Sequence, residues 1–429
     1  MLVIEAKLKG TTTQYSKLDE AIRTGQFIRN TCLRYWEANI GVTRNDLQKL
    51  CSVLAKNKET PWAKKLNSQA RQAQADRAWS AIQRFYENCR LEKPGKKGYP
   101  KDKKFSRSVE YKNSGWKLSY DRRQITFTDG FKVGTMDLWS SRDLVCYAEK
   151  QISRVRVIRR ADGYYAQFLL DWDRREKHEF KGKMTVIDLG LKEFYTDSDG
   201  NTVENPKYLR KSERRIKMLQ RRVSKKHIKG KKQSNRYQKA RQALALANLK
   251  ISRQREDRAR KEALALVKSN DLIVYEDLKI QNMVKNHHLA KSISDASWYQ
   301  FTQWLQYFAK VHGVIVIAVP PHNTTVDCSC CQAKVKKTLS TRTHKCSACG
   351  TVLDRDHNAA KNILAKGFKL LAEYLNSTVG HTESGAKSSK AQGETNLWLK
   401  NGDVLALSWL DELRTKNSWE SPSRFGTPN

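Results

Sequence analysis

Four cysteines in two close pairs constrain this chain more than any other feature. Cys328 and Cys331 form the first pair, Cys346 and Cys349 form the second, and fourteen residues separate the pairs. Thiols at this spacing can close a tetrahedral zinc site of the structural kind, which folds a small loop. Because only four residues lie between Cys349 and Asp354, whatever the metal orders lies beside a carboxylate.

The chain also carries a large excess of positive charge. Lysine and arginine total 82 against 44 aspartates and glutamates, a formal net charge of +38 over 429 residues. Such an excess opposes compact folding unless a polyanion neutralises it, and phosphates are the usual polyanion. We therefore expect that the chain binds nucleic acid. The alternative is an ordinary basic protein without such a partner, which we consider the weaker interpretation of this charge.

The other cysteines and the apolar runs indicate the compartment. Five of the nine cysteines lie between Cys328 and Cys349 and four are scattered singly, which favours one metal site in a reducing compartment over a disulfide framework. The first ten residues lack the apolar core of a secretory signal. The longest apolar run, Val314–Val319, is far too short to span a bilayer. We expect a soluble cytoplasmic protein that does not act on a membrane.

The N-terminal part of the chain has the pattern of an all-β domain that helices interrupt. Leu2–Lys9 alternates apolar and polar residues like a half-buried strand, and residues from about 15 to 91 follow a helical period. Short strand-like runs bounded by turns then continue to about Trp172. The helices are thus inserted after the first strand.

A second architecture begins at Met184. Met184–Leu189 is predicted to be a buried strand that opens a β-meander, and further strands are expected at Leu272–Tyr275 and Val314–Val319. Helices are expected between these strands and from about Asn358. Strands that alternate with helices in this order predict an α/β sheet.

One segment of the second architecture is extremely basic. From Lys207 to Lys250 there are seventeen lysines or arginines and a single acid, Glu213. Two apolar stripes on either side of Gly230 predict a helical hairpin. Charge runs are usually solvated surfaces, but the imbalance here is too one-sided for helices held by salt bridges. We interpret the hairpin as an arm that faces nucleic acid.

Acids occur where predicted strands and helices of the second architecture meet loops. Asp188 lies within a strand, Glu276 ends one, and Asp354 and Asp356 precede the last helix. Converging carboxylates can hold two Mg²⁺ ions about 3.5–4 Å apart for phosphodiester chemistry. Each acid could instead cap a turn or a helix, and Asp277 competes with Glu276 because neighbours on a strand face opposite sides. The residues alone do not decide between Glu276 and Asp277, or between Asp354 and Asp356.

Several motifs of the second architecture resemble those of one family. They read Ile187-Asp-Leu-Gly-Leu-Lys192, Tyr275-Glu-Asp-Leu278, Met283-Val-Lys-Asn286, Leu289-Ala290, Ile293-Ser-Asp-Ala-Ser-Trp298 and Asp354-Arg-Asp-His-Asn-Ala-Ala360. Together they resemble TnpB, the transposon-encoded ancestors of the compact type V CRISPR nucleases. The resemblance covers about residues 1–370 and is weakest over the N-terminal helices.

The resemblance implies an α/β plus β fold. A RuvC-type, RNase H-like nuclease domain with a zinc-ribbon insertion would follow an oligonucleotide-binding β-barrel, or wedge domain, that has a helical insertion. The implied segments are 1–14 (first strand of the barrel), 15–91 (helical recognition insertion), 92–180 (rest of the barrel), 181–320 (nuclease domain, with the basic hairpin at 204–268), 321–353 (zinc-binding loop that contacts the target nucleic acid), 354–376 (last nuclease segment) and 377–429 (disordered tail).

The resemblance also implies roles for individual residues. Asp188 and Glu276 match the first and second catalytic acids, and Asp356 matches the third, with Asp354 as the alternative. These acids would bind two Mg²⁺ ions. Arg342 matches a zinc-loop arginine that reaches the active site in compact relatives.

The zinc ligands implied by the resemblance are Cys328, Cys331, Cys346 and Cys349. The first knuckle departs from the family, because it reads Cys-Ser-Cys-Cys-Gln where the family usually has Cys-x-x-Cys-Gly. The additional thiol of Cys330 could compete as a ligand, although a Cys-x-Cys pair suits a tetrahedral site less well. Losing the glycine should strain the knuckle modestly.

The function implied by the resemblance is RNA-guided cleavage of DNA. The partners would be a guide RNA derived from the transposon end and double-stranded target DNA beside a short motif, at the prokaryotic nucleoid, with Mg²⁺ and Zn²⁺ as cofactors. Two alternatives remain: a nuclease-inactive, RNA-guided DNA-binding regulator, and a DNA strand-transferase or transposase accessory. The presence of all three acids argues against the regulator. It does not separate hydrolysis from strand transfer, because both use the same metals.

Overall fold

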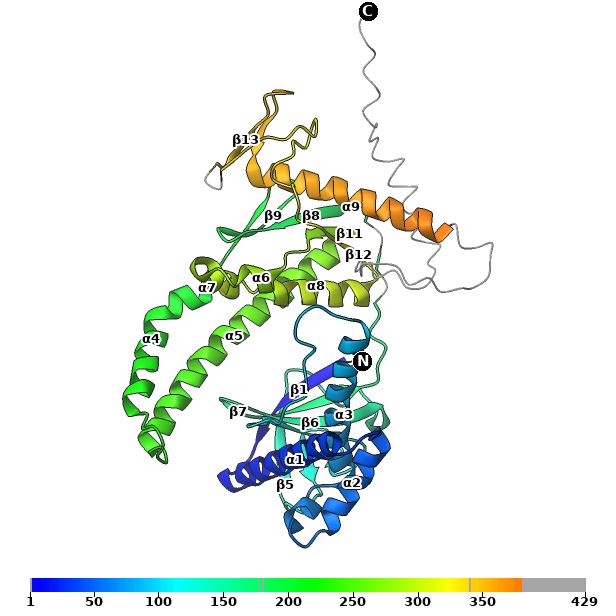
Figure 1. The fold of residues 1–429 in the computed structure, drawn as a ribbon, viewed down its shortest axis with the longest axis vertical. Helices are drawn as coiled ribbons and strands as arrows, with labels where there is room; N and C mark the ends of the chain where they lie inside the picture. The colour runs from blue at the N-terminus through cyan, green and yellow to red at the C-terminus, as the bar shows by residue number, and fades with distance from the viewer. Residues whose placement is uncertain (1, 177, 180, 339–340, 380–429) are drawn as a thin grey trace, which may run out of the picture. The chain divides into compact units, whose positions relative to one another are not determined.

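The computed structural model describes residues 2–176, 178–179, 181–338 and 341–379. The chain divides into two compact units, Met1–Arg174 and Arg175–Asn429, and both have hydrophobic cores of their own (Figure 1). Among the helices of the described residues, none has the length and apolar character that crossing a membrane requires.

The first unit is built on a seven-stranded antiparallel sheet with the order β2-β6-β7-β1-β5-β4-β3. Its strands are β1 (Leu2–Lys9), β2 (Ser108–Tyr111), β3 (Trp116–Leu118), β4 (Gln124–Phe127), β5 (Gly134–Trp139), β6 (Ile152–Arg160) and β7 (Gly163–Leu170). The expected strand at Leu2–Lys9 is therefore present, at the centre of the sheet between β5 and β7. Its alternate residues Leu2, Ile4, Ala6 and Leu8 are buried in the core, as its sequence pattern predicts.

This sheet must curl. Its edge strands β2 and β3 are consecutive in the chain and are joined by residues 112–115. In a flat seven-stranded sheet, six spacings of about 4.8 Å would hold the edges about 29 Å apart. The chain from Tyr111 to Trp116 can span at most about 18 Å. The edges therefore approach each other, as a barrel requires, although no ladder joins β2 to β3 within the described residues.

Helices interrupt this sheet between β1 and β2, as predicted. They are α1 (Thr12–Ala38), α2 (Arg44–Lys56), the 3₁₀ turn η1 (Pro61–Lys65) and α3 (Ser68–Arg90); a further turn, η2 (Glu149–Gln151), precedes β6. The side chains of Thr11, Thr43 and Asn67 accept backbone N–H groups at the starts of the three α-helices. These caps explain where each helix begins.

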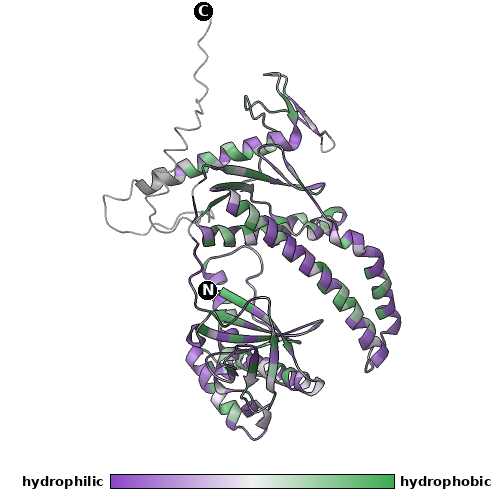
Figure 2. Cartoon of the chain, turned by 180° about the vertical axis from the view of Figure 1, so that it is seen from behind, coloured by the Kyte–Doolittle hydropathy of each residue, from purple (hydrophilic) through white to green (hydrophobic). Residues whose placement is uncertain are grey.

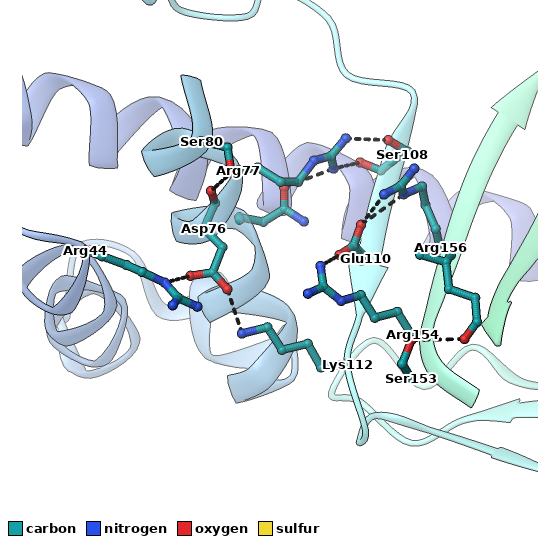
Figure 3. Close-up of polar contacts among 12 residues, drawn as sticks. Arg44, Asp76, Arg77, Ser80, Ser108, Glu110, Lys112, Ser153, Arg154 and Arg156 are labelled. Atoms are coloured by element: carbon teal, nitrogen blue, oxygen red, sulfur yellow. Dashed lines mark hydrogen bonds and ion pairs between the residues drawn. The ribbon is translucent and has the colours of Figure 1, made fainter. Parts of the chain in front are cut away.

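Ion pairs fasten the inserted helices and the sheet (Figure 3). Glu110 of β2 is only 2% exposed, and it accepts hydrogen bonds from Arg154 at 2.9 Å and Arg156 at 2.7 Å, both on β6. Asp76 of α3 accepts from Lys112, just after β2, at 2.7 Å. A buried carboxylate is tolerated when cations satisfy its oxygens in this way.

The second unit contains a five-stranded mixed sheet with the order β10-β9-β8-β11-β12. Its strands are β8 (Met184–Leu189), β9 (Glu193–Asp197), β10 (Thr202–Glu204), β11 (Leu272–Glu276) and β12 (Ile315–Val319). The first three form the predicted antiparallel meander. β11 lies parallel to β8 on one side and to β12 on the other. The strands expected at Met184–Leu189, Leu272–Tyr275 and Val314–Val319 are thus present as β8, β11 and β12.

Helices cover both faces of this sheet (Figure 1). They are α4 (Tyr208–Lys226), α5 (Asn235–Ser269), α6 (Ile280–Met283), α7 (His287–Ala296), α8 (Trp298–His312) and α9 (Arg355–Val379). One face packs on α9 through a cluster that includes Val186 and Val274. The other face packs on α5, α7 and α8 through Ile187, Ile273 and Phe301. The basic segment forms the predicted hairpin, α4 and α5.

The cysteine loop carries a two-stranded sheet and leads directly into α9. Its strands are β13 (Thr343–Lys345) and β14 (Val352–Asp354), paired antiparallel. α9 continues to Val379, past the start of the tail expected at 377–429. The rest of that tail lies outside the described residues.

Gly367 determines how closely α9 approaches the sheet. A Cβ atom at this position would lie 2.7 Å from both methyl carbons of Val274 in β11. Val274 is fully buried and β-branched, so its side chain cannot swing away. Glycine therefore lets α9 pack directly on the strand that ends at Glu276.

We expect Gly367→Ala to lower the free energy of unfolding by about 1–3 kcal/mol, the usual cost of overpacking. In a helix without such a contact the same change stabilises by up to about 1 kcal/mol. Denaturant unfolding of both variants decides the sign, and Ala365→Gly on the exposed face of α9 is the control, with an expected cost of about 1 kcal/mol. A more stable Gly367→Ala protein would contradict the close approach.

Candidate active site and zinc-binding loop

Two of the predicted catalytic acids lie on the face of the sheet that α9 covers. Successive side chains on a strand point to opposite faces, so Asp188 shares the face of Val186, and Glu276 shares that of Val274. Both valines belong to the cluster packed on α9. β8 and β11 are parallel neighbours, and Ile187 is paired with Tyr275. The next residues, Asp188 on β8 and Glu276 on β11, therefore lie at the same level of the sheet.

Glu276 occupies a buried environment that Asp277 does not share. Glu276 is 7% exposed, and its Oε1 accepts a hydrogen bond of 2.5 Å from the Thr324 hydroxyl. Burial raises the pKa of Glu276, which the Thr324 hydrogen bond and the charge of Lys366 only partly offset. Asp277 is exposed, and its backbone N–H extends the ladder to β12. Of the two neighbours, Glu276 is the one held inside the fold.

The two aspartates before α9 have different surroundings. Asp354 is exposed, and its Oδ1 accepts the backbone N–H groups of Asp356 at 2.8 Å and His357 at 3.3 Å. This is the pattern of a helix N-cap. Asp356 lies in the first turn of α9, so its carboxylate is not needed for capping.

The carboxylate of Asp188 is affected by the charges of the other two acids. The pKa of Asp188 is raised well above its ordinary value, first by burial and then by the carboxylates of Glu276 and Asp356, while Arg355 lowers it less. Charges have such an effect only when they lie close to one another. The ionised form of Asp188 is therefore destabilised by neighbouring negative charge, and carboxylate oxygens are the hard donors that Mg²⁺ prefers.

In buffer without added Mg²⁺, we expect Asp188→Asn to be more stable than the wild type. A pKa raised by folding contributes stability below the unfolded-state pKa, and this stability is lost as the pH rises through the folded-state value. The advantage of the variant should therefore grow from about pH 4 upward, by at most about 1.4 kcal/mol per pH unit.

Thermal unfolding across this pH range, with and without Mg²⁺, checks the prediction. Mg²⁺ should stabilise the wild type and have little effect on Asp188→Asn. Asp199→Asn, at the exposed turn after β9, is the control and should change neither curve. An Asp188→Asn protein that is less stable at neutral pH would show that the acids do not repel one another.

Arg342 of the cysteine loop reaches the third acid. Its Nη1 atom is 3.5 Å from Oδ2 of Asp356. Its carbonyl accepts the N–H of Arg355 at 2.6 Å, which ties the loop to the start of α9. The Arg342 side chain is 58% exposed, and exposed pairs of this length contribute at most about 1 kcal/mol. The guanidinium is thus near Asp356 but loosely held.

The four paired cysteines lie together. Their sulfur atoms are all within 4.8 Å of one another, with 3.7 Å between Cys328 and Cys349 and 3.6 Å between Cys331 and Cys346. Zn–S bonds of about 2.3 Å in a tetrahedron place the sulfurs about 3.8 Å apart. The group could therefore hold zinc. Cys330 is exposed and is not a member of it.

The two cysteine knuckles differ at the residue after the second thiol. The N–H groups of Gln332 and Gly350 donate in the same way, to the carbonyls of Cys328 at 2.9 Å and Cys346 at 3.0 Å. Both residues have a positive φ, 62° for Gln332 and 73° for Gly350. That conformation costs a residue with a Cβ about 1–2 kcal/mol and costs glycine little. The strain expected from the loss of the glycine therefore arises from the positive φ of Gln332.

We expect Gln332→Gly to stabilise the loop by up to about 1 kcal/mol and Gly350→Gln to destabilise it by a similar amount. Zinc retention against a competing chelator, measured for both variants, checks the prediction. Removing the zinc from the wild type should unfold the loop. Less than one zinc per chain in the purified wild type would contradict a structural site.

Three buried polar residues near the acids carried no weight in the sequence interpretation. Thr324, Asn358 and Asn362 are 3%, 0% and 4% exposed. Thr324 contacts Glu276, and both asparagines contact the backbone of residues 324–329. Asparagines four apart within the apolar face of a helix start are a signal that could have been noticed. Thr324 has no such signal.

The basic hairpin is hydrophilic along much of its length (Figure 2), and most of its lysines and arginines between Lys207 and Lys250 are exposed. Leu219 is the buried residue of α4, and α5 buries residues from Ile251 onward. Hydrogen bonds from Lys217 and Lys291 lower the pKa of Glu213, the single acid between Lys207 and Lys250, to about 2. Since this acid is neutralised by its neighbours, the other lysines and arginines between Lys207 and Lys250 leave this part of the hairpin with charge of one sign, which suits a phosphate backbone.

Comparison with known proteins places the chain in a family. A family model described as "Probable transposase" matches residues 167–287, and one described as "Cas12f1-like, TNB domain" matches residues 298–363. A TnpB-like protein of Methanocaldococcus jannaschii is 29% identical over 160 residues, 36% of this chain and 73% of that protein. A protein of Streptomyces pristinaespiralis named "Putative RNA-guided DNA endonuclease" is 33% identical over 276 residues, 63% of this chain and 67% of that protein. The chain belongs to the TnpB family.

Further similarities agree with this membership. The "Putative RNA-guided DNA endonuclease InsQ" of Escherichia coli K12 is 28% identical over 331 residues, 73% of this chain and 78% of that protein. Among solved structures, "Structure of the mini-RNA-guided endonuclease CRISPR-Cas_phi3" matches with a TM-score of 0.51 over 85% of this chain and 92% of that chain, at 10% identity. At this identity the likeness is one of fold: this TnpB chain has the fold of a compact type V nuclease.

Proposed function

We propose that this TnpB protein is an RNA-guided DNA endonuclease that cuts guide-matched DNA beside a short sequence motif. The observation that carries the proposal is geometric: Asp188 and Glu276 lie at the ends of neighbouring parallel strands on the face that α9 covers, and Asp356 lies in the first turn of α9. Two similar proteins are named as RNA-guided DNA endonucleases. We assign the second unit to the RuvC-type, RNase H-like class on this basis.

The acids would hold two Mg²⁺ ions, and Asp356 is our choice over Asp354 because Asp354 caps α9. The fit rests on the raised pKa of Asp188 and Glu276, which marks carboxylates that no arginine or lysine satisfies fully. When bound, the ions supply Lewis-acid activation of a water and charge stabilisation at the leaving oxygen.

The chain's own residues supply orientation and charge. Thr324 holds the Glu276 carboxylate, and the helix cap at Asp354 fixes the first turn of α9, which carries Asp356. Arg342, loosely paired with Asp356, can turn toward a phosphate oxygen that approaches the site. The zinc in this proposal is a brace for the loop and takes no part in the reaction.

The partners we propose are a guide RNA made from the transposon end and double-stranded target DNA. In RNA-guided recognition, base pairing selects the sequence while the protein grips an A-form heteroduplex by its backbone. The basic surface of α4 and α5 suits such a grip, and so does the net charge of +38. We assign the wedge role to the curled sheet of the first unit.

Cleavage of a plasmid that carries a match to the bound guide tests the function. The guide is found by sequencing the RNA that co-purifies with the protein. We expect the wild type to cut in Mg²⁺ and Asp188→Ala to lose at least about 10³-fold of the rate while binding RNA as before, because the acid contributes to chemistry alone. Asp277→Ala is the matched control and should cut normally.

Other outcomes would favour the other functions. Target binding by the wild type without a Mg²⁺-dependent product would favour a nuclease-inactive regulator. Joining of a donor DNA end to the target would favour a strand-transferase. Cutting by Asp188→Ala at the wild-type rate would show that the active site is wrongly assigned.

A further inference from the structure

The segment His322–Ser329, which we call the strap, links the sheet to the cysteine loop. It begins three residues after β12 and contains the first zinc-loop cysteine, Cys328. Side chains of α9 spaced by four residues, and therefore on one face of the helix, contact the strap backbone. They are Asn358, which bonds to the Asp327 carbonyl and the Ser329 N–H; Asn362, which bonds to the carbonyls of Thr324 and Asp327; and Lys366, which bonds to the His322 carbonyl.

One end of the strap holds an acid of the active site. The Thr324 hydroxyl donates to Oε1 of Glu276 at 2.5 Å, and the Thr324 carbonyl accepts from Nδ2 of Asn362 at 2.9 Å. All three residues are buried, with at most 7% of each exposed. A strong hydrogen bond from a single donor fixes the side-chain rotamer of a buried carboxylate. The rotamer of Glu276 therefore depends on the position of Thr324, which Asn362 holds by its backbone.

The other end of the strap holds a zinc ligand. Asn358 accepts the N–H of Ser329 at 3.0 Å and donates to the carbonyl of Asp327 at 2.9 Å, so it grips the backbone on both sides of Cys328. Asn362 adds a second donor to the same Asp327 carbonyl at 2.6 Å. Since Asn358 and Cys328 are both fully buried, neither position can shift without the other.

We propose that the strap couples the zinc loop to the active site, and that Thr324, Asn358 and Asn362 are positioning residues for Glu276. The proposal rests on the proposed function for the identity of the ion, Mg²⁺. α9 then sets two of the three acids: it carries Asp356 itself, and it places Glu276 through the strap. Loss of zinc would therefore weaken Mg²⁺ binding by Glu276, although every Mg²⁺ ligand would still be present.

The first test replaces the hydroxyl that touches Glu276. We expect Thr324→Val, which keeps the shape, to raise the Mg²⁺ concentration for half-maximal thermal stabilisation of the full chain about tenfold, the effect of losing one hydrogen bond to a charged group. Thr324→Ser should restore the wild-type value, and both variants should retain one zinc per chain. An unchanged Mg²⁺ response in Thr324→Val, or a failure of Thr324→Ser to restore it, would overturn the proposal.

The second test acts at a distance from the acid. Asn362→Leu touches neither Glu276 nor a thiol in the wild-type contacts, yet it should raise the Mg²⁺ requirement about tenfold and speed the loss of zinc to 1,10-phenanthroline. Asn270→Leu is the matched control, because Asn270 is buried and bonds to the end of α5. It should lower the unfolding temperature without changing the Mg²⁺ response. Equal Mg²⁺ responses in the two variants would contradict the coupling.

These measurements separate the strap from the function. They use Mg²⁺ binding and zinc retention, so they need neither guide RNA nor target DNA. If the wild type binds Mg²⁺ and the Thr324 variants behave as expected but no DNA is cut, the strap stands and the proposed function fails. If Mg²⁺ does not stabilise the wild type, the assignment of the site is wrong and the strap positions no metal ligand.

Discussion

The second unit is organised around an unfavourable interaction, the repulsion of Asp188 by the carboxylates of Glu276 and Asp356. Glu110, a buried acid of the first unit, instead has arginine partners: it lies between Arg154 and Arg156 of β6, and although burial raises its pKa, these arginines lower it overall. Within the described residues, neither Asp188 nor Glu276 forms an ion pair. Carboxylates placed near one another without an arginine or lysine partner are suited to bind a cation.

The surrounding structure holds these acids against their repulsion. Asp188 and Glu276 are fixed by the pairing of β8 with β11, and α9 is seated on that pair because Gly367 permits a close approach to Val274. Asp354 caps the same helix. Backbone pairing, helix packing and a cap thus position the acids through rigid elements, while the exposed Arg342 stays adjustable.

Much of the fold followed from local pattern. The alternation in Leu2–Lys9, the apolar run at Met184–Leu189 and the apolar stripes of the hairpin all predicted elements that the structure contains, because periodicity depends on neighbours in the chain. The curl of the first sheet did not follow, since it arises from the short link between strands at opposite edges. Thr324 was missed because its importance comes from a contact 48 residues away in sequence.

The sequence by itself determined the chemical inventory: four thiols at zinc-binding spacing, acids beside apolar strands, and an excess of positive charge. Ligand spacing and charge are properties of the chain, so they can be read without coordinates. Only the tertiary structure gave grounds to choose between the members of each pair, because it shows Asp354 capping α9 and Glu276 buried while Asp277 faces solvent. Those choices depend on sheet alternation and on the seating of α9, which no local pattern records.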